Sequence, residues 1–167
     1  MTEGITEIYC GNGRGKTTLA IGQSLRASVQ GKRVIIIQFL KGRERRELDF
    51  LEELEGHDIK IFRFEKMENC YQELNDHEKE EERQNILNGV NFARKVVSTN
   101  ECDFLVLDEV LGLVEIGIID AEALGEILKM KDERMQVVLT GTAFPEQLRP
   151  YIDSITELTT TYNAREE

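Results

Sequence analysis

Tryptophan is absent from this chain of 167 residues, and proline occurs only twice, as Pro145 and Pro150. The sequence also lacks Pro/Ser-rich linkers, internal repeats and low-complexity tracts, which are the usual signs of a boundary between domains. Its length suits one hydrophobic core. We therefore expect residues 1–167 to form a single domain.

Cysteine is scarce as well. Cys10, Cys70 and Cys102 are odd in number and show no C-x-x-C spacing, which argues against a disulfide framework and against a zinc site. No apolar run approaches the roughly 20 residues that span a bilayer. The first residues, MTEGITE, lack the basic and apolar segments of a secretory signal. We expect a cytoplasmic protein that has no membrane partner.

Positive charge is in deficit, with 21 Lys and Arg against 32 Asp and Glu and a net charge of −11. Proteins that bind nucleic acids depend mainly on Lys and Arg to neutralise phosphates, so this balance argues against a nucleic-acid partner. The densest acidic run, residues 76–83, opens a helical pattern. Acidic side chains at a helix N-terminus are favoured by the helix dipole, so we interpret this run as a solvated helix start.

Short apolar runs alternate with helical patterns along the chain. Runs such as VIII and FLVL are apolar on both faces, as in a parallel sheet that helices cover. The expected N-terminal caps are Asp76 and Asp120, and the expected C-terminal glycines are Gly31 and Gly56. Strands are expected at 5–10, 33–39, 59–64, 103–108, 136–141 and 154–160, and helices at about 16–30, 44–55, 76–99, 120–131 and 146–152.

This alternation predicts an α/β fold. We expect a doubly wound, mostly parallel sheet of five or six strands with helices on both faces. Ligands bind to such sheets at the carboxyl ends of the strands, so residues that follow the predicted strands are the first candidates for a site.

The stretch GNGRGKTT, residues 11–18, follows the first predicted strand and opens the first predicted helix. Its glycines allow successive N–H groups to form an anion nest beside the positive end of the helix. Lys16 supplies an ammonium group for phosphate oxygens, and Thr17 a hydroxyl for a magnesium ion. The loop is one residue tighter than the usual G-x-x-x-x-G-K-[ST], because Cys10 stands where a glycine is expected. The motif predicts that residues 1–167 form a single P-loop nucleotide-binding domain with a P-loop NTPase-like fold. The predicted nucleotide-binding residues are Gly11, Asn12, Gly13, Arg14, Gly15, Lys16, Thr17, Thr18 and Gln38.

Two further clusters follow predicted strands. Asp108 and Glu109 end the run FLVLDE, and together with Thr17 they are the predicted ligands of Mg²⁺ or Mn²⁺. Gln38 and Lys41 follow the second strand, and Arg43, Arg45 and Arg46 lie just beyond. We favour a functional role for Lys41. For the three arginines, contact with an anionic substrate and a solvated helix start are equally compatible with the sequence.

In their order, four motifs resemble one family. They are G-N-G-R-G-K-T-T at 11–18, Q-F-L-K-G at 38–42, V-L-D-E at 106–109 and L-T-G at 139–141. The chain is similar over about residues 4–158 to the P-loop ATP:corrinoid adenosyltransferases, also called cob(I)alamin adenosyltransferases. The shortened loop is that family's own form of the motif.

This resemblance implies a reaction in which the reduced cobalt of cob(I)alamin attacks the 5′ carbon of ATP, tripolyphosphate leaves and adenosylcobalamin forms. It implies ATP and a reduced corrinoid as substrates, a flavoprotein as a candidate reductant, and a homodimer. Lys16, Lys41 and Glu109 are then the expected catalytic residues. A divergent P-loop ATPase and a nucleotide-binding regulatory module of the same ancestry are the alternatives.

Aromatic side chains are where the sequence departs from the family. Its members place a G-F-x-W segment after the third strand to shield the lower face of the corrinoid. The corresponding residues here, 65–73, read EKMENCYQE. Tyr71 is the aromatic candidate in this segment, and Phe62 and Phe64 lie just before it.

Overall fold

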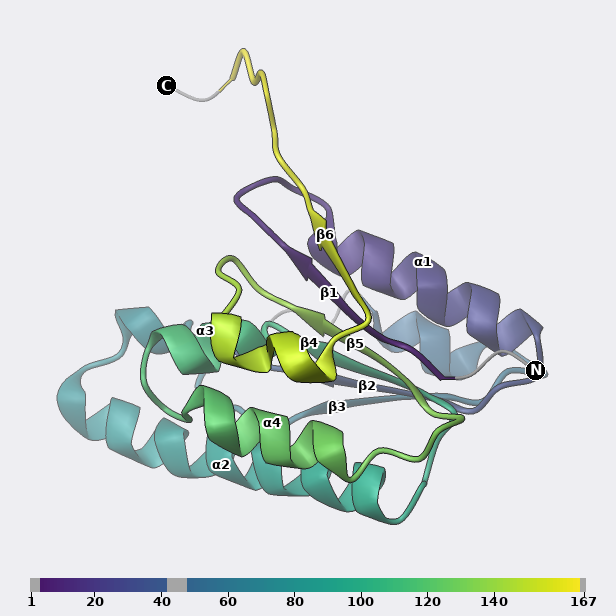
Figure 1. Ribbon diagram of the computed structural model, residues 1–167. Helices are drawn as coiled ribbons and strands as arrows, with labels where there is room; N and C mark the ends of the chain where they lie inside the picture. Colours follow the sequence, from purple (N-terminus) through teal and green to yellow (C-terminus); the bar gives the residue numbers. More distant parts are fainter. Residues whose placement is uncertain (1–3, 42–47, 166–167) are drawn as a thin grey trace.

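The computed structural model describes residues 4–41 and 48–165. Figure 1 shows a central sheet with helices on both of its sides. In chain order the elements are β1 (Thr6–Cys10), α1 (Lys16–Val29), β2 (Val34–Gln38), η1 (Asp49–Glu53), β3 (Ile59–Arg63), η2 (Tyr71–Glu73), α2 (Asp76–Ser98), β4 (Phe104–Asp108), α3 (Val110–Glu115), α4 (Ala121–Lys129), β5 (Gln136–Thr140), η3 (Glu146–Tyr151) and β6 (Ser154–Glu157), where η marks a 3₁₀ helix.

Within this part of the chain, six strands form one sheet in the order β3-β2-β4-β5-β1-β6. Every neighbouring pair is parallel, so all the strands end at the same edge of the sheet. The prediction of a doubly wound α/β sheet is confirmed. Because β1 and β4 are separated by β5 alone, the loop after β1 and the residues after β4 meet at one edge.

Apolar side chains pack on both faces of the sheet. On one face, Ile36 and Val106 pack in a cluster with Ala20 and Ala27 of α1. On the other, Leu107 joins a larger cluster that α2 and α4 supply, with α3 and η3 beside them. Both sides of β2 and β4 are therefore buried, which explains why these strands are apolar without alternation.

Most of the expected helices form, with four corrections. The helix expected at 44–55 is a 3₁₀ helix over Asp49–Glu53, and its residues 44–47 lie outside the described residues. The helix expected at 146–152 is also 3₁₀, and it contains Pro150, which has no N–H group to donate. Helix α3 was not expected. The N-cap of α2 is Asn75, one residue before the predicted Asp76.

The cap of α2 shows why the prediction was off by one residue. The Asn75 side chain accepts a hydrogen bond from the Glu78 N–H, and the Glu78 carboxylate accepts one from the Asn75 N–H. This reciprocal pair satisfies two N–H groups at once, an advantage that Asp76 could not match because the residue three positions after it is Lys79. In the described part of the chain, no helix is both long and apolar enough to cross a membrane.

Candidate active site

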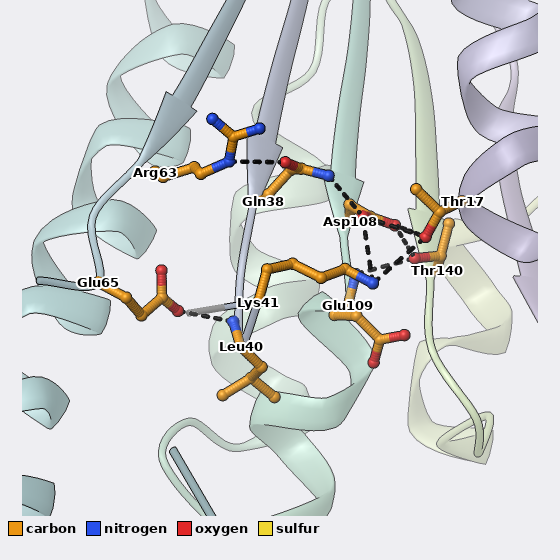
Figure 2. A network of polar contacts seen from close by, with 9 residues as sticks. All are labelled: Thr17, Gln38, Leu40, Lys41, Arg63, Glu65, Asp108, Glu109 and Thr140. Carbon is orange, nitrogen blue, oxygen red and sulfur yellow. Dashed lines mark hydrogen bonds and ion pairs between the residues drawn. The ribbon is translucent and has the colours of Figure 1, made fainter. Parts of the chain in front are cut away.

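On the sheet face that packs against α1, the side chains of β2, β3, β4 and β5 are polar at the last residue of each strand. Gln38 ends β2 and lies in register with Arg63 at the end of β3 and with Asp108 at the end of β4. Thr140 ends β5, the next strand of the sheet. These four side chains form a polar row across four strands, and Thr17 in the first turn of α1 lies beside it (Figure 2).

Asp108 is the centre of this row. Its side chain is 1% exposed. One carboxylate oxygen, Oδ1, accepts hydrogen bonds from the hydroxyls of Thr17 at 3.0 Å and Thr140 at 2.7 Å. The other, Oδ2, accepts one from the Gln38 amide at 3.1 Å and lies 3.8 Å from Lys41 Nζ. These contacts fix the carboxylate in position, because each of its neighbours donates to it or carries positive charge.

Thr17 and Asp108 fit a magnesium ion. A hydroxyl and a carboxylate oxygen about 3 Å apart are hard ligands of the kind Mg²⁺ prefers, and this ion usually takes one or two protein ligands with phosphates and waters completing its shell. Among the described residues there is no group of three or more His, Cys, Asp or Glu that could hold a metal on its own. The residues present therefore suit a nucleotide-bound magnesium rather than a permanent metal centre.

The glycine-rich loop joins β1 to α1 with a left-handed backbone at Gly11 (φ 102°) and at Gly15 (φ 98°), the N-cap of α1. A Cβ atom at Gly11 or Gly13 would overlap the backbone of Leu158, so both positions need glycine. Lys16 folds back over the loop, and its Nζ donates to the carbonyl oxygens of Gly11 at 2.6 Å and Gly13 at 3.0 Å.

Several N–H groups of this loop are bonded to other parts of the protein. The Gly13 N–H donates to the Leu158 carbonyl oxygen at 2.8 Å, and the Arg14 N–H donates to the Thr160 hydroxyl at 3.2 Å. The first N–H groups of α1, from Lys16 onward, precede the first helical hydrogen bond and face the same edge of the sheet. The predicted anion nest is thus centred on the start of α1 rather than on the whole loop.

Lys41 reaches the row from a turn after β2. Its Nζ lies 3.5 Å from the Thr17 hydroxyl. The turn is held by Leu40, which has a left-handed backbone (φ 60°) and donates its N–H to Glu65 Oε1 at 2.7 Å. Burial raises the pKa of the Glu65 carboxyl, and the nearby Glu82 raises it further. Glu65 therefore holds the backbone turn from which the Lys41 side chain extends.

Glu109 is turned away from this cluster. Its backbone is left-handed (φ 62°), and its N–H donates to the Thr140 hydroxyl at 2.8 Å. Its carboxylate lies over the first turn of α3, where a Cβ at Gly112 would be 3.5 Å from Oε2. In Figure 2 it is drawn below the Asp108 carboxylate, beyond the end of the strand. The structure thus brings Thr17 and Asp108 together but leaves Glu109 apart from them.

The remaining predicted residues lie around this cluster. Asn12, Arg14 and Thr18 are exposed at the start of α1, while Gln38 is 4% exposed and bonded on both sides within the row. Arg43, Arg45 and Arg46 lie outside the described residues.

The three aromatic candidates differ in position. Phe62 and Phe64 both pack against Phe92 of α2, with ring centroids 4.6 Å and 5.4 Å apart. Tyr71 is half-buried in η2, with Lys79 Nζ 5.8 Å from its ring centre. Tyr71 is therefore the one of the three that does not take part in this aromatic packing.

Sequence reasoning missed three members of the site: Thr140, Arg63 and Glu65. Thr140 belongs to the motif L-T-G, which could have pointed to it. Arg63 and Glu65 carry no such signal, because only the strand register places Arg63 beside Gln38 and only the fold brings Glu65 to Leu40.

Comparison with known proteins agrees with this geometry. The family model for ATP:corrinoid adenosyltransferase BtuR/CobO/CobP matches residues 2–166. A corrinoid adenosyltransferase of Escherichia coli K12 is 27% identical over 158 residues, which cover 93% of this chain and 76% of that protein. Corrinoid adenosyltransferase CobA of Salmonella typhimurium matches to the same extent. A KaiC-like protein of Pyrococcus horikoshii has the same fold with a TM-score of 0.58 and 21% identity, covering 95% of this chain and 74% of its own.

Proposed function

Because the chain belongs to the ATP:corrinoid adenosyltransferase family, a family of transferases, we propose that it transfers the 5′-deoxyadenosyl group of ATP to the reduced cobalt of a corrinoid. A cobalt–carbon bond forms at C5′ while the C5′–O5′ bond breaks. The bonding electron pair of that bond leaves on the oxygen of tripolyphosphate. The nucleophile belongs to the corrinoid substrate, so the protein's task is to position ATP and to stabilise a polyanionic leaving group.

The observation that carries the nucleotide half of this proposal is the contact between Thr17 and Asp108 at the start of α1. These two residues would hold a magnesium ion, which supplies charge neutralisation between phosphates. Lys16 and the first N–H groups of α1 would bind phosphate oxygens from the loop side. Lys41, on the other side of Thr17, would add a second positive charge.

Glu109 is the residue that bears on the choice between transfer and ATP hydrolysis. A hydrolase needs a residue that orients or deprotonates the attacking water beside the phosphates. Glu109 is the free carboxylate nearest to Asp108 in sequence, and its side chain turns toward α3 instead. A reaction whose nucleophile is a reduced cobalt needs no such base.

The test is a product analysis under anaerobic conditions. The protein is mixed with MgATP and chemically reduced cob(I)alamin, and we expect the cob(I) spectrum to disappear with one tripolyphosphate formed per cobalt–carbon bond. Formation of ADP and orthophosphate in place of these products would overturn the proposal in favour of an ATPase. Unchanged ATP would favour the regulatory module.

An ATP analogue with an imido group between its β and γ phosphorus atoms makes this test sharper. That substitution blocks cleavage of the terminal phosphate but leaves C5′ and its oxygen unaltered. We expect the analogue to replace ATP in the transfer reaction. If the analogue is inert while ATP is consumed, attack occurs at phosphorus and the proposed function fails.

A further inference from the structure

We propose that Arg63 is a positioning residue for the magnesium–ATP site: it fixes the orientation of the Gln38 amide and, through that amide, the Asp108 carboxylate. This inference rests on the proposed function only in taking Thr17 and Asp108 as the magnesium ligands. Arg63 ends β3, two strands away from β4, and its contact within the row is with Gln38, which lies between it and Asp108.

The geometry forms a chain of polar contacts across three strands. Arg63 Nε donates to Gln38 Oε1 at 2.9 Å, and Gln38 Nε2 donates to Asp108 Oδ2 at 3.1 Å. Figure 2 shows the three side chains in one line along the ends of β3, β2 and β4. The line follows the strand register, in which Arg63 is paired with Gln38 and Gln38 with Asp108.

The chemistry of the three groups allows a single direction for this chain. An arginine side chain only donates hydrogen bonds, so it must face the amide oxygen of Gln38. That leaves the amide NH₂ to face Asp108, which as a carboxylate only accepts. Without Arg63 the amide would be held at one end only, by Asp108, so Gln38 would be freer to move and would fix the position of the carboxylate beside Thr17 less firmly.

A purely structural role explains Arg63 poorly. Its other partner in the described part of the chain is Asp49 of η1, at 2.7 Å, in a pair whose Arg63 side chain is 16% exposed and whose Asp49 side chain is 43% exposed. Such half-exposed ion pairs contribute little to stability. Arg63 Nη2 is buried and has no hydrogen-bond partner among the described residues, which is a cost to the folded state.

The experiment measures the affinity for ATP by calorimetry across a series of Mg²⁺ concentrations and also with the metal removed by a chelator. Arg63→Met keeps the length of the side chain and removes its donors. The quantity compared is the Mg²⁺ concentration at which half of the metal-dependent gain in ATP affinity is reached. We expect Arg63→Met to raise this concentration by about tenfold, as is typical when a partner behind a metal ligand is lost. The affinity for metal-free ATP should change by less than about twofold.

Two further variants make the result specific. Arg63→Lys keeps one positively charged donor for Gln38 Oε1, so it should bring the Mg²⁺ requirement back toward that of the unaltered protein. Arg33→Met is the matched control, because Arg33 pairs with Asp103 at 3.0 Å at the opposite end of β2 and β4. It should leave the Mg²⁺ requirement unchanged.

The inference is overturned if Arg63→Met leaves the Mg²⁺ requirement unchanged, or if it weakens metal-free and metal-dependent binding equally. If thermal unfolding shows that this variant does not fold, Arg63→Gln takes its place with the same expectation, since a neutral amide no longer forces one orientation on Gln38. The two proposals can fail separately. If Arg63→Met shifts the Mg²⁺ requirement but the unaltered protein forms no tripolyphosphate, the role of Arg63 stands and the transferase proposal is overturned.

Discussion

At the scale of single residues, Asp108 shows how a buried carboxylate can be held in one position by its neighbours. Three donors and one ammonium group surround it, and two of the donors, Thr140 and Gln38, belong to neighbouring strands. Buried charge is costly unless it is paired and hydrogen-bonded, and here the neighbours meet that need before any ligand arrives. The same neighbours restrict the carboxylate to one position, facing Thr17.

Lys16 should carry much of the affinity for nucleotide. Its Nζ donates to two loop carbonyls, so it already lies at the mouth of the loop. We expect Lys16→Ala to weaken binding of MgATP at least about tenfold, because a hydrogen bond to a charged group contributes about 1.5–3 kcal/mol. Calorimetric titration measures the change. Lys32→Ala, which removes a lysine bonded to Gln136 far from the loop, is the control and should bind as the unaltered protein does. If Lys16→Ala and Lys32→Ala bind MgATP with equal affinity, the glycine-rich loop is not the phosphate site.

Glu65 should make the stability of the protein depend on pH. Burial raises the pKa of its carboxyl above the usual 4.5, so the folded state holds its proton more tightly than the unfolded state does. The contribution of Glu65 is then fully present below about pH 4.5 and declines as pH rises through the raised pKa. Glu65→Gln keeps an acceptor for the Leu40 N–H and carries no charge. We expect this variant to gain stability relative to the unaltered protein as pH rises from about 5 to about 8.

Urea unfolding at several pH values measures this difference. Glu68→Gln alters an exposed carboxylate in the same segment and is the control, for which no such trend is expected. A constant difference between Glu65→Gln and the unaltered protein at every pH would contradict the prediction.

At the scale of elements, the strands followed from the sequence because their residues are buried on both faces. The runs VIIIQ and FLVLD match β2 and β4 closely. Helix α3 was missed because its residues, VLGLVE, continue the apolar run of β4 after a single left-handed residue, Glu109. Periodicity cannot separate so short a helix from the end of a strand. The place of Arg63 was missed for a different reason. The run IKIFRF looks like an ordinary edge strand, and the register between strands is a property of the fold.

Helix α2 offers a test of how tightly the elements pack. Gly89 faces β3 and the turn after β2, and a Cβ there would lie 2.9 Å from an atom of Phe64 and 3.0 Å from one of Phe39. Alanine is the better helix former by about 1 kcal/mol, yet overpacking typically costs 1–3 kcal/mol. We expect Gly89→Ala to destabilise the protein by about 1 kcal/mol. Gly22→Ala in α1 is the matched control, since nothing lies within 4 Å of its added carbon.

The two variants should therefore change stability in opposite directions. Gly22→Ala should stabilise the protein by about 0.5–1 kcal/mol through helix propensity alone. Chemical unfolding curves measure both. If Gly89→Ala stabilises the protein instead, the aromatic rings beside α2 can move to accommodate the added carbon without a loss of stability.

At the scale of the whole molecule, the candidate site consists of a well-formed nucleotide half and a sparse aromatic half. The polar row, the loop and α1 meet at the carboxyl edge of the sheet, where ligands bind in open α/β folds. Of the aromatic candidates in and after β3, Phe62 and Phe64 pack against Phe92. Tyr71 is therefore the aromatic residue of the three that we propose to lie against a corrinoid.

This asymmetry predicts how the reaction should depend on the state of the cobalt. Cob(I)alamin is already a strong nucleophile, so holding ATP in the right orientation can support its reaction, and orientation contributes several kcal/mol. Cob(II)alamin must first lose its lower ligand before it is easily reduced, and that step needs aromatic shielding. We expect efficient adenosylation of chemically reduced cob(I)alamin and slow adenosylation from cob(II)alamin with a mild reductant. Anaerobic spectroscopy with MgATP measures both rates. Tyr71→Ala should lower the second rate and spare the first, whereas equal rates from the two starting states would mean that this chain shields the cobalt by other residues.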